Sequence, residues 1–235
     1  MLSNINRFYS VVGVEPQHDS FAVTLDGKPI QTPKRAAFSV RNRALADAVA
    51  AEWDAQEERV VLACMPLTRL VASSIDLMPA CREQIIDETA AYVATDLVCY
   101  RADYPPELTN RQEYTWQPLI DGFNRYFHVE LCVGKGIQPI KQDPDSIVYV
   151  RRELASQNDM ELMGLHRVTT ILGSVVIALA ISRDEIDVDA AWQASIVDES
   201  FQIERWGLDD EDKKRRDINY VDYNAAVKFM HLNRL

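Results

Sequence analysis

The sequence predicts an α+β protein, with a small N-terminal antiparallel β domain followed by a larger all-helical C-terminal domain. Two observations point to this class. The first forty residues are rich in aromatic and β-branched side chains, whereas apolar residues recur every three or four positions from residue 43 onward. A chain of 235 residues has ample material for a buried core. The predicted domains are residues 1–62, which include a linking helix, and residues 63–235.

The β unit is predicted for residues 7–41. The stretches "RFYSVVGV" and "SFAVTL" have the composition of strands. Asp26 and Gly27 lie between two extended runs in "TLDGKPI", and both positions of such a turn favour positive φ. Pro29 and Pro33 disfavour a helix nearby. We therefore expect a hairpin centred on Asp26 and Gly27.

The remainder of the chain has helical periodicity. Leu45, Val49 and Trp53 recur at intervals of four and form one apolar stripe. Pro118 predicts a kink or a break. The apolar run at 168–181 has 14 residues, too short to span a bilayer, and suits a buried core helix. The predicted helices are 43–57, 65–77, 82–100, 107–128, 144–156, 159–182, 187–206 and 210–232, with a strand-like segment at 129–140.

Charge and cysteine content narrow the class of protein. The formal net charge of −11 argues against nucleic acid as a partner and favours a basic or apolar protein. The four cysteines form no C-x-x-C pair, which predicts reduced, mostly buried thiols in a reducing compartment. The N-terminus resembles neither a signal peptide nor a transit peptide. We expect a bacterial cytoplasmic protein, or a mitochondrial matrix protein if the chain is a mature organellar form.

The sequence offers no recognisable catalytic, metal or cofactor site. It contains no G-x-S-x-G, G-x-G-x-x-G or H-E-x-x-H motif, and "VGKGI" lacks the other residues of a phosphate-binding loop. The four histidines are scattered. His166 begins the most apolar predicted helix and suits a structural role better than that of a general base. The sequence therefore does not favour an enzyme.

One segment is unusually acidic. Residues 184–217 contain 12 acids against 5 bases. On a helical wheel, residues 190–206 show two apolar stripes on nearly opposite sides. A polar strip runs between the stripes and contains Ser195, Asp198, Glu199, Gln202 and Trp206. A helix of this kind packs on two sides, or packs on one side and offers the other to a partner.

Two interpretations remain open for this segment and for Trp53. The predicted 190–206 helix is either a core helix with a solvated edge or a surface whose carboxylates meet basic groups of another protein. Trp53 is either part of the apolar packing with Leu45 and Val49 or an interface anchor, a role in which tryptophan is enriched.

Eight stretches together resemble one protein family. They are "RFY", "LDGKPIQTP", "ALADAVAAEWDAQ", "MPLTRL", "YVATDLVCYRA", "WQPLIDGF", "LHRVTTILGSVVIALA" and "DESFQIERWGLDDED", all found in this order from residue 7 to 212. They resemble the F1 ATP synthase assembly chaperones that bind the free α subunit. The resemblance implies a non-enzymatic chaperone, a β-rich N-terminal domain and a helical C-terminal domain. It also implies that the chaperone covers apolar surface of the α subunit until the β subunit covers it in the α3β3 hexamer.

The resemblance also implies site residues. The family's acidic position before "QIERWG" matches Asp198, with Glu199, Gln202 and Trp206 beside it. Members of the family often carry glutamate there, so Glu199 is expected to share the contact. The "EWDAQ" stretch adds Glu52 and Asp54 as partner-binding candidates. It also includes Trp53, which we expect where the two predicted domains meet, acting through folding more than through direct contact.

Two other functions compete with this expectation. One is a generic adaptor for another complex, which would be distinguished only by its partner. The other is a hydrolase or isomerase that uses Asp198 together with Asp96 or Glu199. Such an enzyme needs a closed pocket and an acid whose pKa is strongly raised. Chaperoning itself requires only a monomer, no cofactor and no insertion into a membrane.

Overall fold

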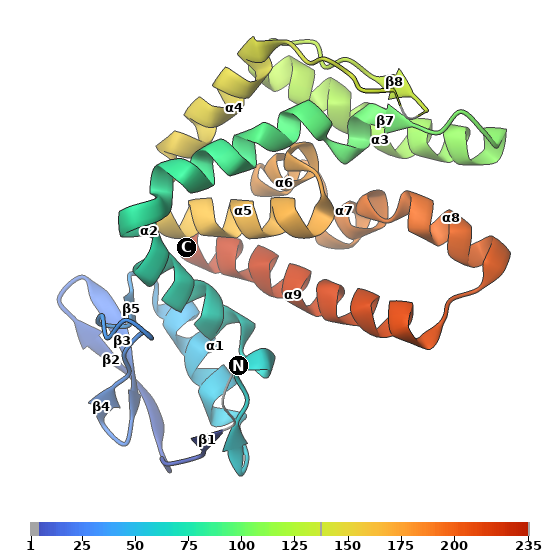
Figure 1. Ribbon diagram of the computed structural model, residues 1–235. Helices are drawn as coiled ribbons and strands as arrows, with labels where there is room; N and C mark the ends of the chain where they lie inside the picture. The colour runs from blue at the N-terminus through green and yellow to red at the C-terminus, as the bar shows by residue number, and fades with distance from the viewer. Residues whose placement is uncertain (1–4, 137, 235) are drawn as a thin grey trace. The chain divides into compact units, whose positions relative to one another are not determined.

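The computed structural model describes residues 5–136 and 138–234 and confirms the α+β class. Small antiparallel sheets occupy the N-terminal part, and helices make up most of the remainder of the chain (Figure 1). None of the described helices is both long enough and apolar enough to cross a membrane.

β3 (Ser20–Leu25) is the central strand of the main sheet. It pairs antiparallel with β2 (Val12–Gln17), with β4 (Lys28–Pro29) and with β5 (Ser39–Val40). Asp26 and Gly27 have φ values of 49° and 76°, which confirms the predicted hairpin turn. A second antiparallel pair joins β1 (Ile5–Asn6) to β6 (Arg59–Val60).

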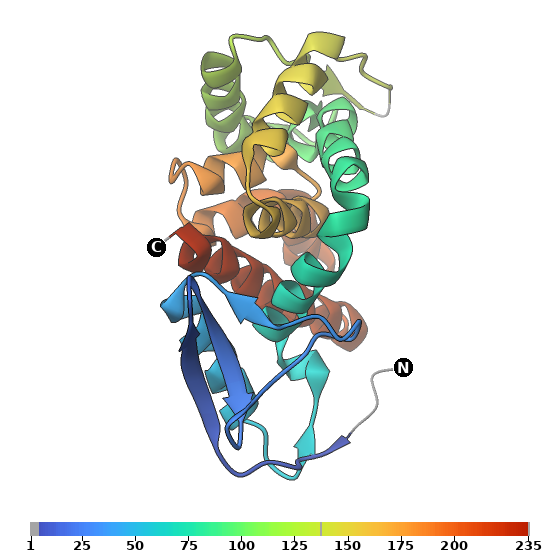
Figure 2. The ribbon, with the colours of Figure 1, turned by 90° about the vertical axis from the view of Figure 1, so that its left-hand side faces the viewer.

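α1 (Arg43–Asp54) packs against β2 and β3, and Figure 2 shows it beside the strands. The side chain of Asn42 caps its first turn by accepting a hydrogen bond from the backbone N–H of Ala44. Leu45 and Val49 are fully buried, and Trp53 is half-buried. The predicted apolar stripe is therefore the packing face of this helix.

α2 (Pro66–Ala91) comes after a short 3₁₀ turn, η1 (Leu62–Cys64), and runs without interruption past Pro79. The predicted break between 77 and 82 was wrong, because buried Met78 and Ile85 continue the packing face across the proline. The predicted helix at 82–100 also ends early. After Ala91 the chain forms η2 (Tyr92–Thr95), η3 (Leu97–Cys99) and β7 (Tyr100–Arg101).

α3 (Pro106–Phe127) contains Pro118 in its interior without ending there, so of the two predicted outcomes, a kink or a break, the break was wrong. Trp116 and Ile120, which are both fully buried, hold the helix on either side of the proline. The strand-like segment at 129–140 contributes only β8 (Gly134–Lys135), which pairs parallel with β7. α4 (Pro144–Ser156) is next in the chain, with Asp143 as its N-cap.

The apolar run at 168–181 is buried as predicted but forms parts of two helices. α5 (Asp159–Leu172) ends before Gly173, which has a φ of 67°, and α6 (Val175–Ser182) begins after Ser174. The Ser174 hydroxyl caps α6 by accepting a hydrogen bond from Ile177 N. A predicted continuous helix over 159–182 was therefore wrong at the glycine.

The predicted helix over 187–206 is also divided. α7 (Val188–Ser195) and α8 (Val197–Trp206) are separated at Ile196, which leaves helical geometry at φ −114° and ψ 22°. The single helical wheel drawn through 190–206 therefore does not describe one helix. α9 (Asp210–Arg234) completes the described chain.

Contacts divide the chain into two compact units. One comprises the residues up to Arg82 together with 158–164 and those from Ala225 onward, and the other comprises 83–157 and 165–224. α2, α5 and α9 each contribute residues to both units. The division at residues 62 and 63 into separate domains stays a prediction.

All four cysteines are free thiols, as predicted. The expectation that most are buried was wrong, because only Cys99 is buried, whereas Cys64 and Cys132 are exposed. Burial raises the pKa of the Cys99 thiol to about 12, which keeps it protonated and unreactive.

Candidate partner-binding surface

α8 presents three of the predicted site residues along one face. Asp198, Gln202 and Trp206 are spaced at intervals of four and therefore lie above one another on the helix. Asp198 is half-buried, Gln202 is exposed, and Trp206 is 78% exposed. Glu199 is exposed beside Asp198 in the first helical turn, where the helix dipole favours negative charge. An exposed tryptophan on an acidic face is suited to contact with another protein.

Asp198 is held in place by a buried glutamine. Gln112 on α3 is 1% exposed, and its Nε2 donates a 2.6 Å hydrogen bond to Asp198 Oδ1. The Oε1 of the same side chain accepts a 2.7 Å hydrogen bond from Ala102 N. Both ends of the amide are used, which fixes its orientation and the position of the carboxylate at the edge of α8.

A buried arginine adds positive charge near this carboxylate. Arg101 lies under the surface, with its guanidinium 5.1 Å from the Trp116 ring. Burial lowers the pKa of Arg101, while the Glu113 carboxylate, 3.5 Å away, and the Asp198 charge act in the opposite direction. Asp198 and Glu113 thus compensate a buried cation in addition to facing solvent.

Two ion pairs tie the outer part of α8 to α3. Arg111 forms a two-pronged pair with Glu204, with N–O distances of 2.7 and 2.9 Å. Hydrogen bonding across this pair raises the pKa of Arg111 and lowers that of Glu204. The second ion pair joins Arg205 to Glu107 at 3.7 Å. Both guanidinium groups also lie over the buried Phe201 ring, at 5.4 Å for Arg111 and 4.3 Å for Arg205. α8 is therefore fixed against α3 while its acidic edge stays open.

Glu52 caps a helix inside the chain. Its carboxylate accepts hydrogen bonds from Leu67 N at 2.7 Å, Thr68 N at 2.8 Å and Thr68 Oγ1 at 2.7 Å, at the start of α2. Burial raises the pKa of Glu52, and these hydrogen bonds act against the rise. The structure therefore gives Glu52 a capping role, and its predicted contact with a partner stays a prediction.

Trp53 belongs to an aromatic cluster at the end of α1. Its ring meets Tyr9 edge to face at 5.8 Å, and the Tyr9 hydroxyl donates a 2.7 Å hydrogen bond to the Trp53 carbonyl. Its indole Nε1 is buried and has no hydrogen-bond partner among the described residues. Asp54 is exposed, 3.6 Å from Arg7. Trp53 is thus a packing residue within its own unit, with Asp54 available at the surface.

Asp96 has the raised pKa that the hydrolase hypothesis requires, but its geometry is structural. The carboxylate is fully buried and accepts hydrogen bonds from Ser174 Oγ, Val176 N and Val98 N at 2.6, 3.1 and 3.2 Å. Burial raises its pKa from 3.8 to about 6. These bonds hold Asp96 at the start of α6, so the geometry does not support a pairing with Asp198 for catalysis.

His166 has the structural role predicted for it. Its Nδ1 lies 2.9 Å from the Thr89 hydroxyl, and burial lowers the pKa of the ring. The described residues contain no group of three or more histidine, cysteine and acidic side chains that could hold a metal ion.

The sequence reasoning missed Gln112, Arg101 and Arg111, which position α8. Gln112 stands in "NRQEYTW", where a glutamine on a helix looks like any surface residue. Its partner Asp198 is 86 positions away, so no local pattern links the two.

Comparison with known proteins assigns the family. Residues 6–124, slightly more than half of the chain, match the model of the ATP12 chaperone protein family. The crystal structure of Atp12 from Paracoccus denitrificans is similar at 35% identity and a TM-score of 0.91, over 98% of this chain and 99% of that one.

Two further structures agree with this assignment. A variant of Paracoccus denitrificans Atp12p with an aspartate-to-lysine substitution is 34% identical, with a TM-score of 0.91 over 99% of this chain and all of that one. A putative chaperone from Agrobacterium tumefaciens is 32% identical, with a TM-score of 0.91 over 96% of this chain and 85% of that one. The protein belongs to the ATP12 chaperone family.

Proposed function

We propose that this protein is an assembly chaperone for the F1 sector of ATP synthase that binds the unassembled α subunit. It shields the apolar surface of the α subunit that faces the β subunit until the α3β3 hexamer forms. Its membership of a chaperone family supports this role. An exposed apolar surface of that kind otherwise drives aggregation.

The observation that carries the proposal is the edge of α8. Asp198 is fixed by a buried glutamine, and exposed Glu199, Gln202 and Trp206 lie beside it. A preformed carboxylate next to an exposed tryptophan can bind a partner that supplies a basic group and an apolar contact. Asp54 on α1 is a further candidate contact.

The protein acts as a monomer in the bacterial cytoplasm, without a cofactor and without catalytic turnover. The net charge of −11 suits a basic or apolar protein client and opposes nucleic acid. Binding needs no reaction, only a surface that covers the client and is later displaced.

Copurification with variants of α8 tests the site. The α subunit from the same source is co-expressed with wild-type chain, with Asp198→Lys or with the matched control Glu130→Lys, an exposed acid on the loop after α3. We expect Asp198→Lys to reduce recovery of the complex by about tenfold, because a lysine places like charge near Arg101 and faces the partner's basic group. Glu130→Lys should leave recovery unchanged.

The milder variant Asp198→Asn separates charge from shape. It retains an oxygen for the Gln112 hydrogen bond and removes the negative charge, so binding should weaken and become less sensitive to salt. Equal recovery for wild type, Asp198→Asn and Asp198→Lys would refute this site. Capture of another protein in preference to the α subunit would favour the adaptor instead.

A further inference from the structure

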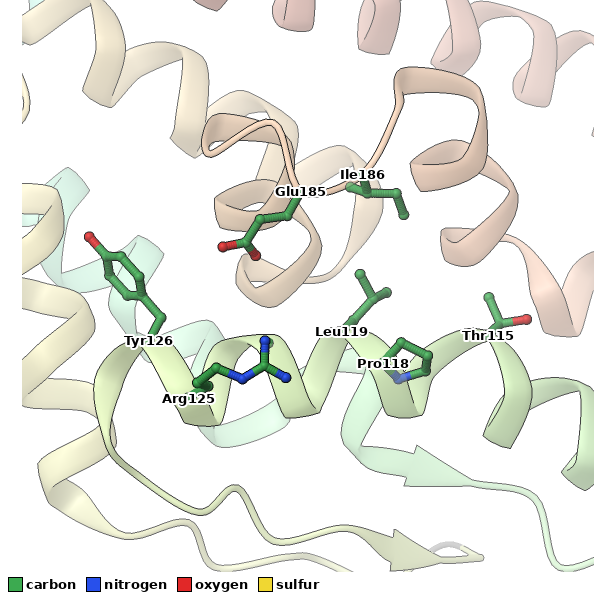
Figure 3. A pocket seen from close by; sticks show the side chains of 8 residues that line it. Thr115, Pro118, Leu119, Arg125, Tyr126, Glu185 and Ile186 are labelled. Atoms are coloured by element: carbon green, nitrogen blue, oxygen red, sulfur yellow. The ribbon is translucent and has the colours of Figure 1, made fainter.

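A groove runs along α3 opposite the segment that leads into α7. It consists of two adjoining cavities of ≈ 480 and ≈ 570 Å³ that share Thr115, Pro118 and Ile186. Figure 3 shows the first cavity, with Glu185 and Ile186 across from Leu119, Pro118 and Arg125 on α3. From Glu113 to Tyr126 the groove extends along α3 for about 20 Å at the helical rise per residue.

The floor of the groove is apolar and built from small or rigid side chains. It is lined by Leu119, Pro118 and Ile186. Its second half is also lined by the small side chains of Ala190 and Ala194. Tyr114 stands at one end and is 87% exposed, and Tyr126 stands at the other and is 46% exposed. Aromatic side chains at the ends of an apolar groove are suited to hold an inserted segment.

Pro118 interrupts the backbone hydrogen bonding of α3 along this floor. A proline inside a helix has no N–H, so the carbonyl of Tyr114, four residues earlier, does not receive the hydrogen bond that an interior position ordinarily has. Both residues line the second cavity. Tyr114 and Pro118 thus lie at the point of the groove where the backbone hydrogen bonding of α3 is interrupted.

The charges of the groove favour a positively charged group on its partner. Glu113 and Asp121 line the second cavity, and none of the described residues that line it with them is basic. Glu113 also lies 3.5 Å from the buried Arg101, so Asp121 is the carboxylate available to a bound cation. In the first cavity Arg125 and Glu185 carry opposite charges, and Glu185 pairs with Arg183 at 2.9 Å, so this half of the groove has no excess of negative charge. The groove is thus acidic toward its second half, in a chain of net charge −11.

The groove adjoins the proposed contact edge of α8. Glu113 lines its second cavity and is the residue directly after Gln112, whose amide binds Asp198. Trp116 lies one turn further along α3 and donates a 2.7 Å hydrogen bond to the carbonyl of Ala194, another lining residue. A partner seated on α8 can therefore extend into the groove without leaving this unit.

We propose that this groove binds an apolar segment of the client protein flanked by a lysine or arginine. The apolar side chains lie over Pro118, Leu119 and Ile186, and the cation lies near Asp121. A helix of about 13 residues or an extended strand of about 6 matches the length of the groove. The inference rests on the proposed function, in which the client is the unassembled α subunit.

Two substitutions test the groove without touching α8. Asp121→Lys reverses its charge, and Ala190→Trp fills its second cavity. The matched controls are Glu130→Lys and Ala91→Trp, which change an exposed acid and an exposed helical alanine away from it. Each full-length variant is co-expressed with the α subunit, and the purified complex is diluted to measure its dissociation constant. Thermal unfolding confirms that each variant is folded.

We expect Asp121→Lys and Ala190→Trp each to raise the dissociation constant by about tenfold or more, as for a residue central to an interface. The controls should stay within about twofold of wild type. Groove variants that bind as tightly as wild type would overturn the groove while leaving the proposed function standing. Failure of wild type to bind the α subunit would instead refute the proposed function.

The oligomeric state provides one more outcome. If the wild-type chain self-associates during sedimentation and Asp121→Lys makes it monomeric, the groove binds a second copy of this chain and the proposal is overturned. A wild-type monomer that binds the client through the groove supports it.

Discussion

Replacement of Glu52 by alanine should destabilise the protein strongly, although this residue lies in a motif expected to bind a partner. The carboxylate accepts hydrogen bonds from two backbone N–H groups and one hydroxyl at the start of α2. Leu67 and Thr68 are buried, so the donors left behind have little access to water. α2 carries the chain from one unit into the other, so the loss is not confined to one turn.

The magnitude can be worked out from the hydrogen bonds and from the burial of the charge. Deleting a helix cap typically costs about 0.5–2 kcal/mol, and a buried donor left unsatisfied costs about 1–3 kcal/mol. Part of this is offset, because burial disfavours the charged form of Glu52 and raises its pKa. We therefore expect the free energy of unfolding to fall by about 2–3 kcal/mol, which lowers the melting temperature by roughly 5–10 °C.

Urea unfolding of Glu52→Ala beside Glu57→Ala measures this loss. Glu57 is exposed, so its replacement should change the free energy of unfolding by less than about 0.5 kcal/mol. The affinity of folded Glu52→Ala for the α subunit should match that of wild type. A variant as stable as Glu57→Ala would refute the capping argument, and a stable variant with weak binding would assign Glu52 to the interface.

Three further results are expected from the packing. Trp53→Ala should lower the free energy of unfolding by about 2–4 kcal/mol in the same urea assay. Trp53→Phe should recover most of this loss, because it keeps an aromatic ring and removes the unpaired indole N–H. Equal losses for the two variants would count against the packing role. Asp96 binds its proton more tightly in the folded state, because burial raises its pKa from 3.8 to about 6. Its titration should therefore lower the free energy of unfolding of the wild type, relative to that of Asp96→Asn, by roughly 2 kcal/mol between pH 4 and pH 7. Parallel pH profiles for the two proteins would contradict this assignment. Pro118→Ala restores a backbone N–H donor for the Tyr114 carbonyl, so it should raise the melting temperature by several degrees in calorimetry. A melting temperature below that of wild type would show that the proline ring itself is needed for packing.

Local signals in the sequence were enough where neighbouring residues decide the structure. Asp26 and Gly27 determine the hairpin because both adopt positive φ, whatever the remainder of the chain does. Leu45 and Val49 mark the buried face of α1 because helical spacing alone brings them together.

Local rules failed where packing outweighs them. A gap was predicted between the helices at 65–77 and 82–100, and a kink or a break at Pro118, yet buried neighbours on both sides keep α2 and α3 continuous past their interior prolines. The sequence does not indicate that α7 and α8 are separated at Ile196, because isoleucine is compatible with a helix. Only the backbone geometry of Ile196 reveals the break.

The candidate site was predicted only in part, because local spacing determines some of its residues and distant contacts determine others. Asp198, Gln202 and Trp206 share a face because four-residue spacing survives within α8. The residue that fixes Asp198 was missed, because Gln112 reaches it across 86 positions of sequence. The groove along α3 was missed as well, since it forms only when the segment before α7 lies opposite that helix.

The central claim is that this chain holds the α subunit only until the β subunit arrives. The most direct measurement co-expresses the two, isolates the complex by size-exclusion chromatography and then adds purified β subunit. The proposal predicts that the α subunit stays soluble with this chain and moves into an αβ complex on addition of β, while the chaperone elutes alone. If the α subunit precipitates equally with and without this chain, or if the complex persists unchanged when β is added, the proposed function is contradicted.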